Sequence, residues 1–272
     1  MPTYITAENV RRATGAPSDL ISDEYIEQAI DLVEKEVERW LNTTFTPTIR
    51  IDVLNGLGRD IIFVKKNPLL SVRYLKTNDT EISLDKIHIY KSSGGIRLSS
   101  QAETSTFINK YKSVIIKYIF GLVIDSDSTT TSSEVSAGSS VSIEVADSSI
   151  FTANDWVRII GTDGYEDYAQ INSIPDSTHI VVDNLNFSHN SGSLVYKQEC
   201  PEHIKRYMEI EAGINIAVYA IGGTYTFNTS YSLGDLTVNK GEPYPQWREV
   251  IQRLLAERNM RREMIKPRFY MG

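Results

Sequence analysis

The feature that most constrains the fold is a change of character at residues 126–200. This segment holds 11 Asp and Glu residues against two basic ones, Arg158 and Lys197, whereas the rest of the chain holds 24 acids and 26 bases. It opens with a Ser/Thr-dense run, 126–142, and continues as short segments in which apolar and polar residues alternate. We therefore expect an acidic β domain, 126–200, inserted into a separate α+β body formed by 1–125 and 201–272.

Length and composition place the chain among ordinary globular proteins. Its 272 residues are 41% apolar and 23% charged. The longest apolar runs are far shorter than the ~20 residues that cross a bilayer, and the N-terminus lacks the pattern of a signal peptide. We therefore expect no membrane association. The single cysteine, Cys200, excludes an internal disulfide; it is either a reactive thiol or an inert residue at a helix start, and the lack of basic neighbours favours the second.

Two helices are expected near the N-terminus, the first over 7–13 after Thr6 and the second after Ser22. In the second, apolar residues recur every three or four positions and predict one buried stripe. The stripe is Ile26, Ala29, Ile30, Val33, Val37, Trp40 and Leu41. Off the stripe, Glu34 and Glu38 form a like-charged pair that weakens an isolated helix. Solvation or a basic partner could offset this cost, and we favour solvation.

From Thr48 the apolar period changes to two, which predicts half-buried strands within 48–120. The acidic segment shows about five further strands, separated by Gly, Asn, Asp and Pro turns, and this spacing favours a small barrel or sandwich. Two more helices are expected after Pro201 and around Trp247. The expected fold class is α+β: a helical body with additional β-strands, plus an inserted all-β domain.

No motif indicates catalysis. The four histidines are scattered without zinc-binding spacing, and the sequence has neither a nucleophile turn nor a phosphate-binding Gly-rich loop. The oxygen-rich stretch 161–167 lacks the calcium-loop pattern and is better explained as a turn. We therefore expect no catalytic residues, no metal site, no cofactor and no enzymatic activity.

The C-terminus combines cations with aromatic residues, namely Arg258, Arg261, Arg262, Lys266, Arg268, Phe269 and Tyr270. Such a segment can contact nucleic-acid phosphates and stack on bases. It can equally become ordered against an acidic or aromatic groove on a protein. The cluster is small and carries no readout motif, which favours the protein partner.

Three parts of the sequence resemble the head-to-tail adaptor (connector) proteins of tailed bacteriophages. The first is the N-terminal arrangement, in which 17–19 is followed by a helix beginning DEYIEQAI and ending VERWL. The second is YSLGDLTV, 231–238, followed by a helix with paired leucines. The third lies in the insert, where 143–151, 154–159 and 189–195 resemble a small β-module of phage virion proteins.

The resemblance implies a helical adaptor body and a structural role in the virion, at the neck between capsid and tail, after synthesis in the bacterial cytoplasm. Adaptors of this kind form a ring, usually of twelve copies, below the portal protein; they extend the DNA channel and present a platform to head-closure or tail proteins. Double-stranded DNA would pass through the lumen without sequence-specific binding. The net charge of −9 on each insert would repel that DNA, so we expect the insert to lie outward.

The resemblance also suggests which residues make contacts. The portal-docking residues would be Arg261, Arg262, Lys266, Arg268, Phe269 and Tyr270. The helix packing against neighbouring subunits would be the one that carries Ile26, Ile30, Val33, Val37 and Trp40. An alternative function is a virion-surface module that binds carbohydrate or a host through Trp156, Tyr165 and Tyr168 of the 126–200 domain, although the apolar strand around Trp156 favours a core position for it.

Overall fold

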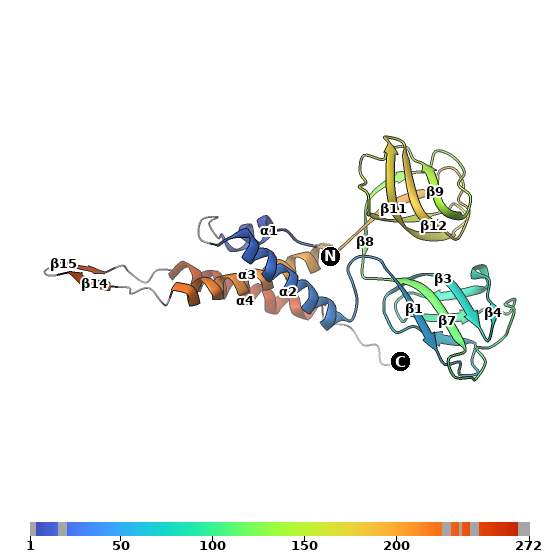
Figure 1. Ribbon diagram of the computed structural model, residues 1–272, viewed down its shortest axis with the longest axis horizontal. Helices are drawn as coiled ribbons and strands as arrows, with labels where there is room; N and C mark the ends of the chain where they lie inside the picture. The colour runs from blue at the N-terminus through green and yellow to red at the C-terminus, as the bar shows by residue number, and fades with distance from the viewer. Residues whose placement is uncertain (1–3, 16–20, 225–229, 234–235, 240–244, 266–272) are drawn as a thin grey trace. The chain divides into compact units, whose positions relative to one another are not determined.

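The computed structural model describes residues 4–15, 21–224, 230–233, 236–239 and 245–265. The chain divides into two compact units (Figure 1). Met1–Leu41 and Glu202–Gly272 form a helical unit, and Asn42–Pro201 forms a β unit. Segment 48–120 thus groups with the acidic segment rather than with the helices, and the expected boundary at 125/126 falls inside a strand, β8.

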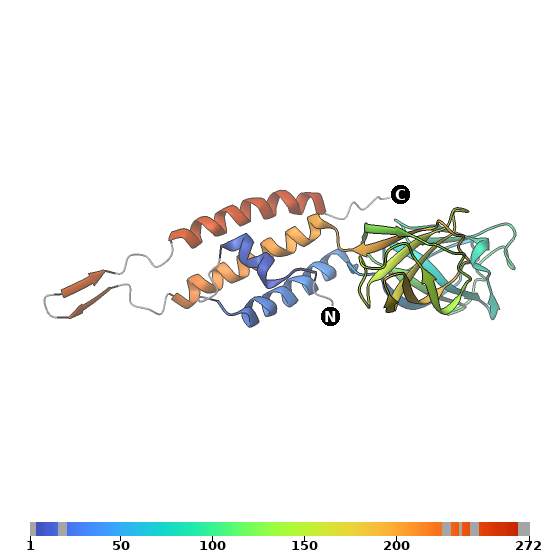
Figure 2. The same cartoon turned by 90° about the horizontal axis from the view of Figure 1, so that it is seen from above.

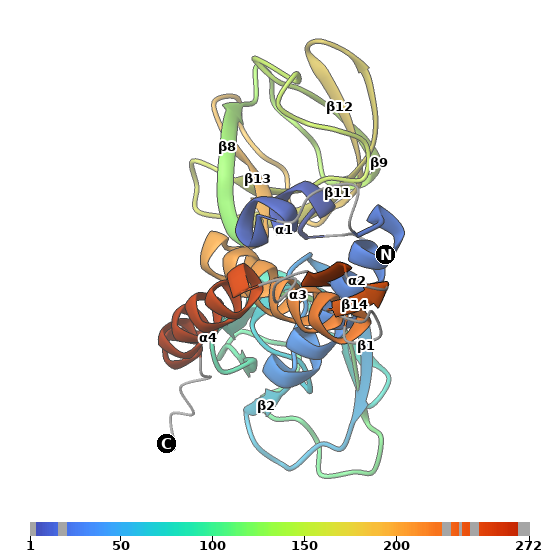
Figure 3. The same ribbon diagram turned by 90° about the vertical axis from the view of Figure 1, so that its left-hand side faces the viewer.

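The helical unit contains α1 (Ala7–Thr14), α2 (Asp23–Leu41), α3 (Glu202–Thr224) and α4 (Pro245–Ile265). Thr6 begins α1 by accepting a hydrogen bond from the Asn9 amide, and Gly15 ends it at a φ of 72°, which glycine adopts without strain. In Figures 2 and 3 α3 lies between α2 and α4, and it contacts α1 as well. The core is aliphatic because each helix turns an apolar stripe inward; Ile30, Met208 and Leu254 are all buried.

A β-hairpin separates α3 from α4 in the chain. Its strands are β14 (Ser230–Leu233) and β15 (Leu236–Asn239), and they form a two-stranded sheet of their own. The register pairs Tyr231 with Val238 and Leu233 with Leu236, so apolar residues oppose apolar ones. Polar residues oppose polar ones at the positions between, which is the arrangement that cross-strand pairing favours.

The first half of the β unit, 42–123, is termed the basic module, since within 48–120 it holds 12 Lys and Arg against six Asp and Glu. One sheet has the order β1-β7-β3-β4 and the other β2-β6-β5. Their apolar inner faces meet in one core, centred on Leu75, Ile96 and Tyr118. The strands are β1 (Thr48–Leu54), β2 (Ile61–Phe63), β3 (Leu69–Thr77), β4 (Thr80–Glu81), β5 (Ile87–Tyr90), β6 (Gly95–Leu98) and β7 (Val114–Phe120), with a 3₁₀ turn at Leu84–Lys86.

The second half, 124–200, is termed the acidic module. Its six strands have the order β8-β13-β10-β11-β12-β9. A bridge between Thr131 and Val145 and a hydrogen bond from the Ser132 amide to the Glu144 carbonyl join the two ends of the sheet, which closes it around an apolar core. The strands are β8 (Ile124–Thr130), β9 (Gly138–Glu144), β10 (Trp156–Ile160), β11 (Glu166–Asp176), β12 (His179–Leu185) and β13 (Leu194–Glu199).

The two modules are joined by a compact contact, termed the joint. Trp156 and Tyr168 of the acidic module pack on Leu70 and Ile119 of the basic module. Beside them, Arg73 donates two hydrogen bonds to the Asp183 carboxylate at 2.6 and 3.0 Å. Lys91 contacts Glu166 at 2.6 Å. The acidic module is therefore fixed to its neighbour by apolar packing and by ion pairs.

The expected fold class was wrong in its balance and its grouping. The described chain is about 37% strand and 29% helix, with the strands in antiparallel sheets, so the molecule is mostly β and is not a helical adaptor body with strands added. The physical reason is that period-two patterns within 48–120 identify strands but carry no information about what covers their buried faces. Those faces cover one another, so the segment needs no helix to complete its core.

Candidate functional site

The C-terminal end of α4 contains the two predicted docking residues that the structure describes. Arg261 donates a hydrogen bond from Nε to Glu257 Oε1 at 2.9 Å, one helical turn back. The Arg262 guanidinium lies 5.6 Å from the centre of the Trp40 ring, at a distance typical of a cation–π contact. Lys266, Arg268, Phe269 and Tyr270 lie outside the described residues.

Trp40 therefore joins two predicted sets of residues. It lies near the end of the apolar stripe of α2, is 36% exposed, and contacts both Arg262 of α4 and Tyr207 of α3, whose ring centre is 6.0 Å away. The Tyr207 hydroxyl donates to Glu211 at 2.7 Å. Burial and this hydrogen bond raise the pKa of Tyr207 well above its ordinary value, so the phenol stays protonated. This cluster, Trp40, Tyr207 and Arg262, is termed the aromatic end of the helical unit.

The other predicted packing residues lie elsewhere. Ile26, Ile30, Val33 and Val37 are at most 4% exposed, because the chain's own helices cover them. They form the core of the helical unit and offer no surface to a neighbouring subunit. Of the five residues predicted to pack between subunits, Trp40 alone presents a substantial exposed area.

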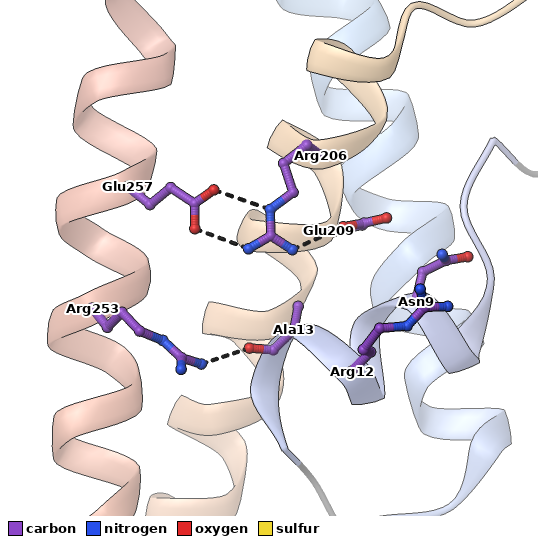
Figure 4. Close-up of a pocket in the computed structure, with 7 residues that line it drawn as sticks. All are labelled: Asn9, Arg12, Ala13, Arg206, Glu209, Arg253 and Glu257. Atoms are coloured by element: carbon purple, nitrogen blue, oxygen red, sulfur yellow. Dashed lines mark hydrogen bonds and ion pairs between the residues drawn. The ribbon is translucent and has the colours of Figure 1, made fainter.

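A polar cavity of about 300 Å³ lies between α1, α3 and α4. Figure 4 shows Arg206 at its centre, held by Glu257 on one side and Glu209 on the other. Hydrogen bonds from Arg206 lower the pKa of Glu257. Arg253 donates to the Ala13 carbonyl at 2.7 Å, so it satisfies a carbonyl in the last turn of α1. Arg12 and Asn9 complete the lining.

The cavity has the composition of a structural ion-pair network rather than of a catalytic centre. Its two carboxylates each contact an arginine. Neither therefore resembles a proton-transfer group whose pKa an apolar pocket raises toward neutral pH. No group of three or more His, Cys, Asp or Glu that could hold a metal ion is found among the described residues. The network can hold α4 against α3 and α1, and through α4 it sets the position of the aromatic end.

The alternative, carbohydrate-binding hypothesis depended on three aromatic residues, and two of them are buried. Trp156 and Tyr168 are about 5% exposed and belong to the joint. Tyr165 is 43% exposed and stacks on Phe187 with ring centres 4.7 Å apart. The three side chains do not form an aromatic platform on the surface, which is what stacking on a sugar ring requires.

Sequence reasoning missed the role of Glu34. We expected it on a solvated face, but it is 7% exposed and accepts hydrogen bonds from the amides of Tyr4 at 2.6 Å and Ile5 at 3.3 Å. The Tyr4 hydroxyl donates to Glu38 at 2.6 Å. The like-charged pair thus fastens the N-terminal segment to α2. The like charges at four-residue spacing were the only signal, and they indicated an unusual environment without identifying it.

No helix in the described part of the chain is long and apolar enough to cross a bilayer. Cys200 is buried at the start of α3. Neither a protein-family model nor a curated protein matches this sequence.

Proposed function

We propose that this chain is a structural protein of a tailed-phage virion, which assembles as a ring that joins the portal vertex to tail or head-closure proteins. The observation that carries the proposal is the hairpin β14–β15. It is formed by the segment whose sequence resembles adaptors, and no third strand pairs with it in the described chain.

A two-stranded hairpin is marginally stable by itself in water. In a folded protein such a hairpin gains stability from something it contacts, and in the proposed ring that contact would be a neighbouring subunit or the portal. The aromatic end supports the same reading. It holds Arg262 on a rigid helix directly before the segment 266–272, which carries the remaining predicted docking residues.

The test is native mass spectrometry of the protein mixed with the portal ring encoded beside it. Full-length protein should add to the ring in a fixed number of copies. A chain ending at Ile265 keeps every contact of α4 described above, and it should fail to add if 266–272 is the docking arm. Addition by both chains would support the proposed ring but would exclude 266–272 as the docking arm. Failure of the full-length chain to add would overturn the proposal.

A double variant separates the helix from the arm. Arg261→Ala with Arg262→Ala leaves 266–272 intact but removes the cation of the aromatic end, Arg262, and its neighbour Arg261. Arg262 already contacts Trp40 within the chain, and the variant keeps 266–272. We therefore expect the variant to add to the portal more weakly but not to lose addition altogether.

A further inference from the structure

Charge is separated along the β unit. The basic module has a net charge of +6 over 48–120, and the acidic module has −9 over 126–200. Ion pairs at the joint, Arg73 with Asp183 and Lys91 with Glu166, involve only a few of these charges. Exposed charges of opposite sign that form no ion pair in the described chain also lie at two other places, one on each module.

The first place is the end of the basic module where β1 stops and β7 begins. Loops 55–59 and 107–113 meet there, and their exposed side chains form a surface termed the basic tip. Its members are Leu57, Arg59, Ile108, Lys110, Tyr111 and Lys112. Leu57 is 61% exposed and Tyr111 72%, so the basic tip presents aliphatic and aromatic area beside its cations.

No cation of the basic tip forms an ion pair in the described chain, although Lys110, after Lys76, helps to lower the pKa of Asp79. Lys110 contacts the amide oxygen of Asn78, and Lys112 lies over the Tyr111 ring. The carboxylates nearest in sequence to the tip loops are already paired, Asp60 with Arg97, Asp52 with Arg50 and Glu103 with Lys86. The tip therefore presents positive charge together with apolar area.

The basic tip is also preorganised. The Gly56 amide donates to the Lys110 carbonyl at 3.1 Å, and the Phe107 amide donates to the Arg59 carbonyl at 2.8 Å. A Cβ on Gly56 would lie 1.8 Å from the Ile108 carbonyl oxygen. Only glycine at position 56 therefore allows the two loops to approach this closely. A surface that is already ordered loses little entropy when it binds.

The second place is the seam where the acidic module closes. Four exposed acids surround it, and none forms an ion pair among the described residues. They are Asp127, Glu134, Glu144 and Asp147, termed the acidic seam. Hydrogen bonds across the closure hold the seam together, for example from the Asp147 amide to Thr129 Oγ1 at 3.1 Å.

We propose that the basic tip of one copy of this chain docks on the acidic seam of a second copy. The same chain supplies both surfaces, but they do not pair within it. The tip lies at the Val114 end of β7, and Ile119 of the joint lies five residues further along, about 17 Å at the rise of an extended strand. Because the joint fixes the acidic module at that far end, charge complementarity is satisfied between copies.

A tip-to-seam contact is heterologous, because different surfaces meet. Repetition of such a contact builds a closed ring or an open filament rather than a symmetric dimer. The proposed ring would form through this tip-to-seam contact. Closure into a ring rests on the proposed function, whereas the contact itself does not. The exposed aliphatic residues Leu57 and Ile108 favour a protein over a nucleic acid, since aliphatic side chains neither neutralise phosphates nor stack on bases.

The test is a charge exchange in the full-length protein, measured by sedimentation velocity over a concentration series. The tip variant carries Lys110→Glu and Lys112→Glu, and the seam variant carries Glu144→Lys and Asp147→Lys. Each alone should self-associate about tenfold more weakly than the natural chain, and raised NaCl should weaken the natural association. An equimolar mixture of the two variants should associate more strongly than either alone, because every contact between unlike copies pairs two natural surfaces or two reversed ones, and both pairs are complementary in charge. A chain carrying all four changes should recover the association.

The matched control carries Lys65→Glu and Lys66→Glu, which changes the charge equally outside the basic tip. It should associate more strongly than the tip variant. Equal loss in both would show a general charge effect and overturn the inference, and so would failure of the fourfold variant to recover. Circular dichroism of each variant establishes that it is folded before association is compared.

Two further readouts separate this inference from other outcomes. If the tip variant associates normally but loses binding to a 30-base-pair duplex in fluorescence anisotropy, the tip is a nucleic-acid surface and the inference is wrong. If the tip and seam variants still add to the portal ring in full number, the inference fails while the adaptor function stands. If the charge exchange succeeds but no chain adds to the portal, the contact stands and the adaptor function fails.

Discussion

At the scale of single residues, the molecule places several charges where sequence patterns do not predict them. Glu34 belongs to a helix face that otherwise looks solvated, yet it is buried and holds two backbone amides. Arg73 finds its partner Asp183 110 positions away. Periodicity reports which face of an element is apolar, but a long-range polar contact leaves no periodic trace. Such residues can be found only after the fold is known.

Glu34 should make the stability of the helical unit depend on pH. Burial raises its pKa above the ordinary 4.5, despite the hydrogen bonds from Tyr4 and Ile5. Between pH 4.5 and the raised pKa, Glu34 is ionised in the unfolded chain but still protonated in the folded chain. The free energy of unfolding therefore falls as pH rises through this range. Glu34→Gln removes this loss. The free energy of unfolding of the variant, relative to the natural chain, should therefore increase from about pH 4.5 upward and then level off, measured by urea titration.

The control for this prediction is Glu36→Gln. Glu36 is an exposed carboxylate on the same helix, so its substitution should give a difference that varies little over the same pH range. If the two variants show the same profile, the effect belongs to the net charge of the helix rather than to the burial of Glu34.

Arg73 should be the most costly charged residue of the joint to remove. Its side chain is 6% exposed and that of Asp183 24%, so Arg73→Ala leaves a largely buried carboxylate without its partner. Loss of one member of such a pair costs about 3 kcal/mol of unfolding free energy. Lys76→Ala removes a pair with an exposed carboxylate, Asp79, and should cost less than about 1 kcal/mol. Equal effects in denaturant titrations would contradict the buried character of the joint.

At the scale of secondary-structure elements, the sequence predicted more. The apolar stripe of α2 and the Thr6 cap of α1 are local signals, and the helices lie where those signals place them. The polar strand β8 was missed because the Ser/Thr-dense run has no alternation. Its residues form a strand because backbone pairing with β13 and closure at Thr131 satisfy their amides and carbonyls.

The stripe of α2 gives a direct test at this scale. Ile30 is 1% exposed, so Ile30→Ala leaves a cavity in the helical core and should cost about 2–5 kcal/mol of unfolding free energy. Leu32, two positions further, is 52% exposed, and Leu32→Ala should change stability by about 0.5 kcal/mol or less. If Ile30 instead packed between subunits, its substitution would reduce ring formation while leaving the stability of the monomer unchanged.

At the scale of the whole molecule, sequence composition showed that 126–200 differs from its surroundings but not what it is attached to. The joint could not be foreseen, because Trp156 and Tyr168 look like ordinary strand residues and their partners Leu70 and Ile119 lie in another module. The candidate docking site was predicted only in part. Arg262 and Trp40 were both named, but their contact depends on how α2 and α4 pack.

The joint predicts that the β unit behaves as one cooperative body. A fragment spanning 42–201 contains a single tryptophan, Trp156, whose fluorescence reports directly on the joint. We expect one thermal transition and a blue-shifted emission maximum. A fragment spanning 124–200 exposes Trp156 and should unfold at a lower temperature, with a red-shifted maximum. Two separate transitions in the longer fragment, one matching the shorter fragment, would contradict the prediction.

The nearness of Trp40 to Tyr207 has a consequence for how such a chain can change over generations. One residue lies at the end of α2 and the other near the start of α3, and their rings are 6.0 Å apart, so both points at which the backbone leaves the helices are neighbours. Insertions are tolerated where the ends of a segment lie close together. The 160 residues between are therefore an exchangeable cassette: genetic recombination at these two points could replace the β unit by a short loop and leave the four helices folded.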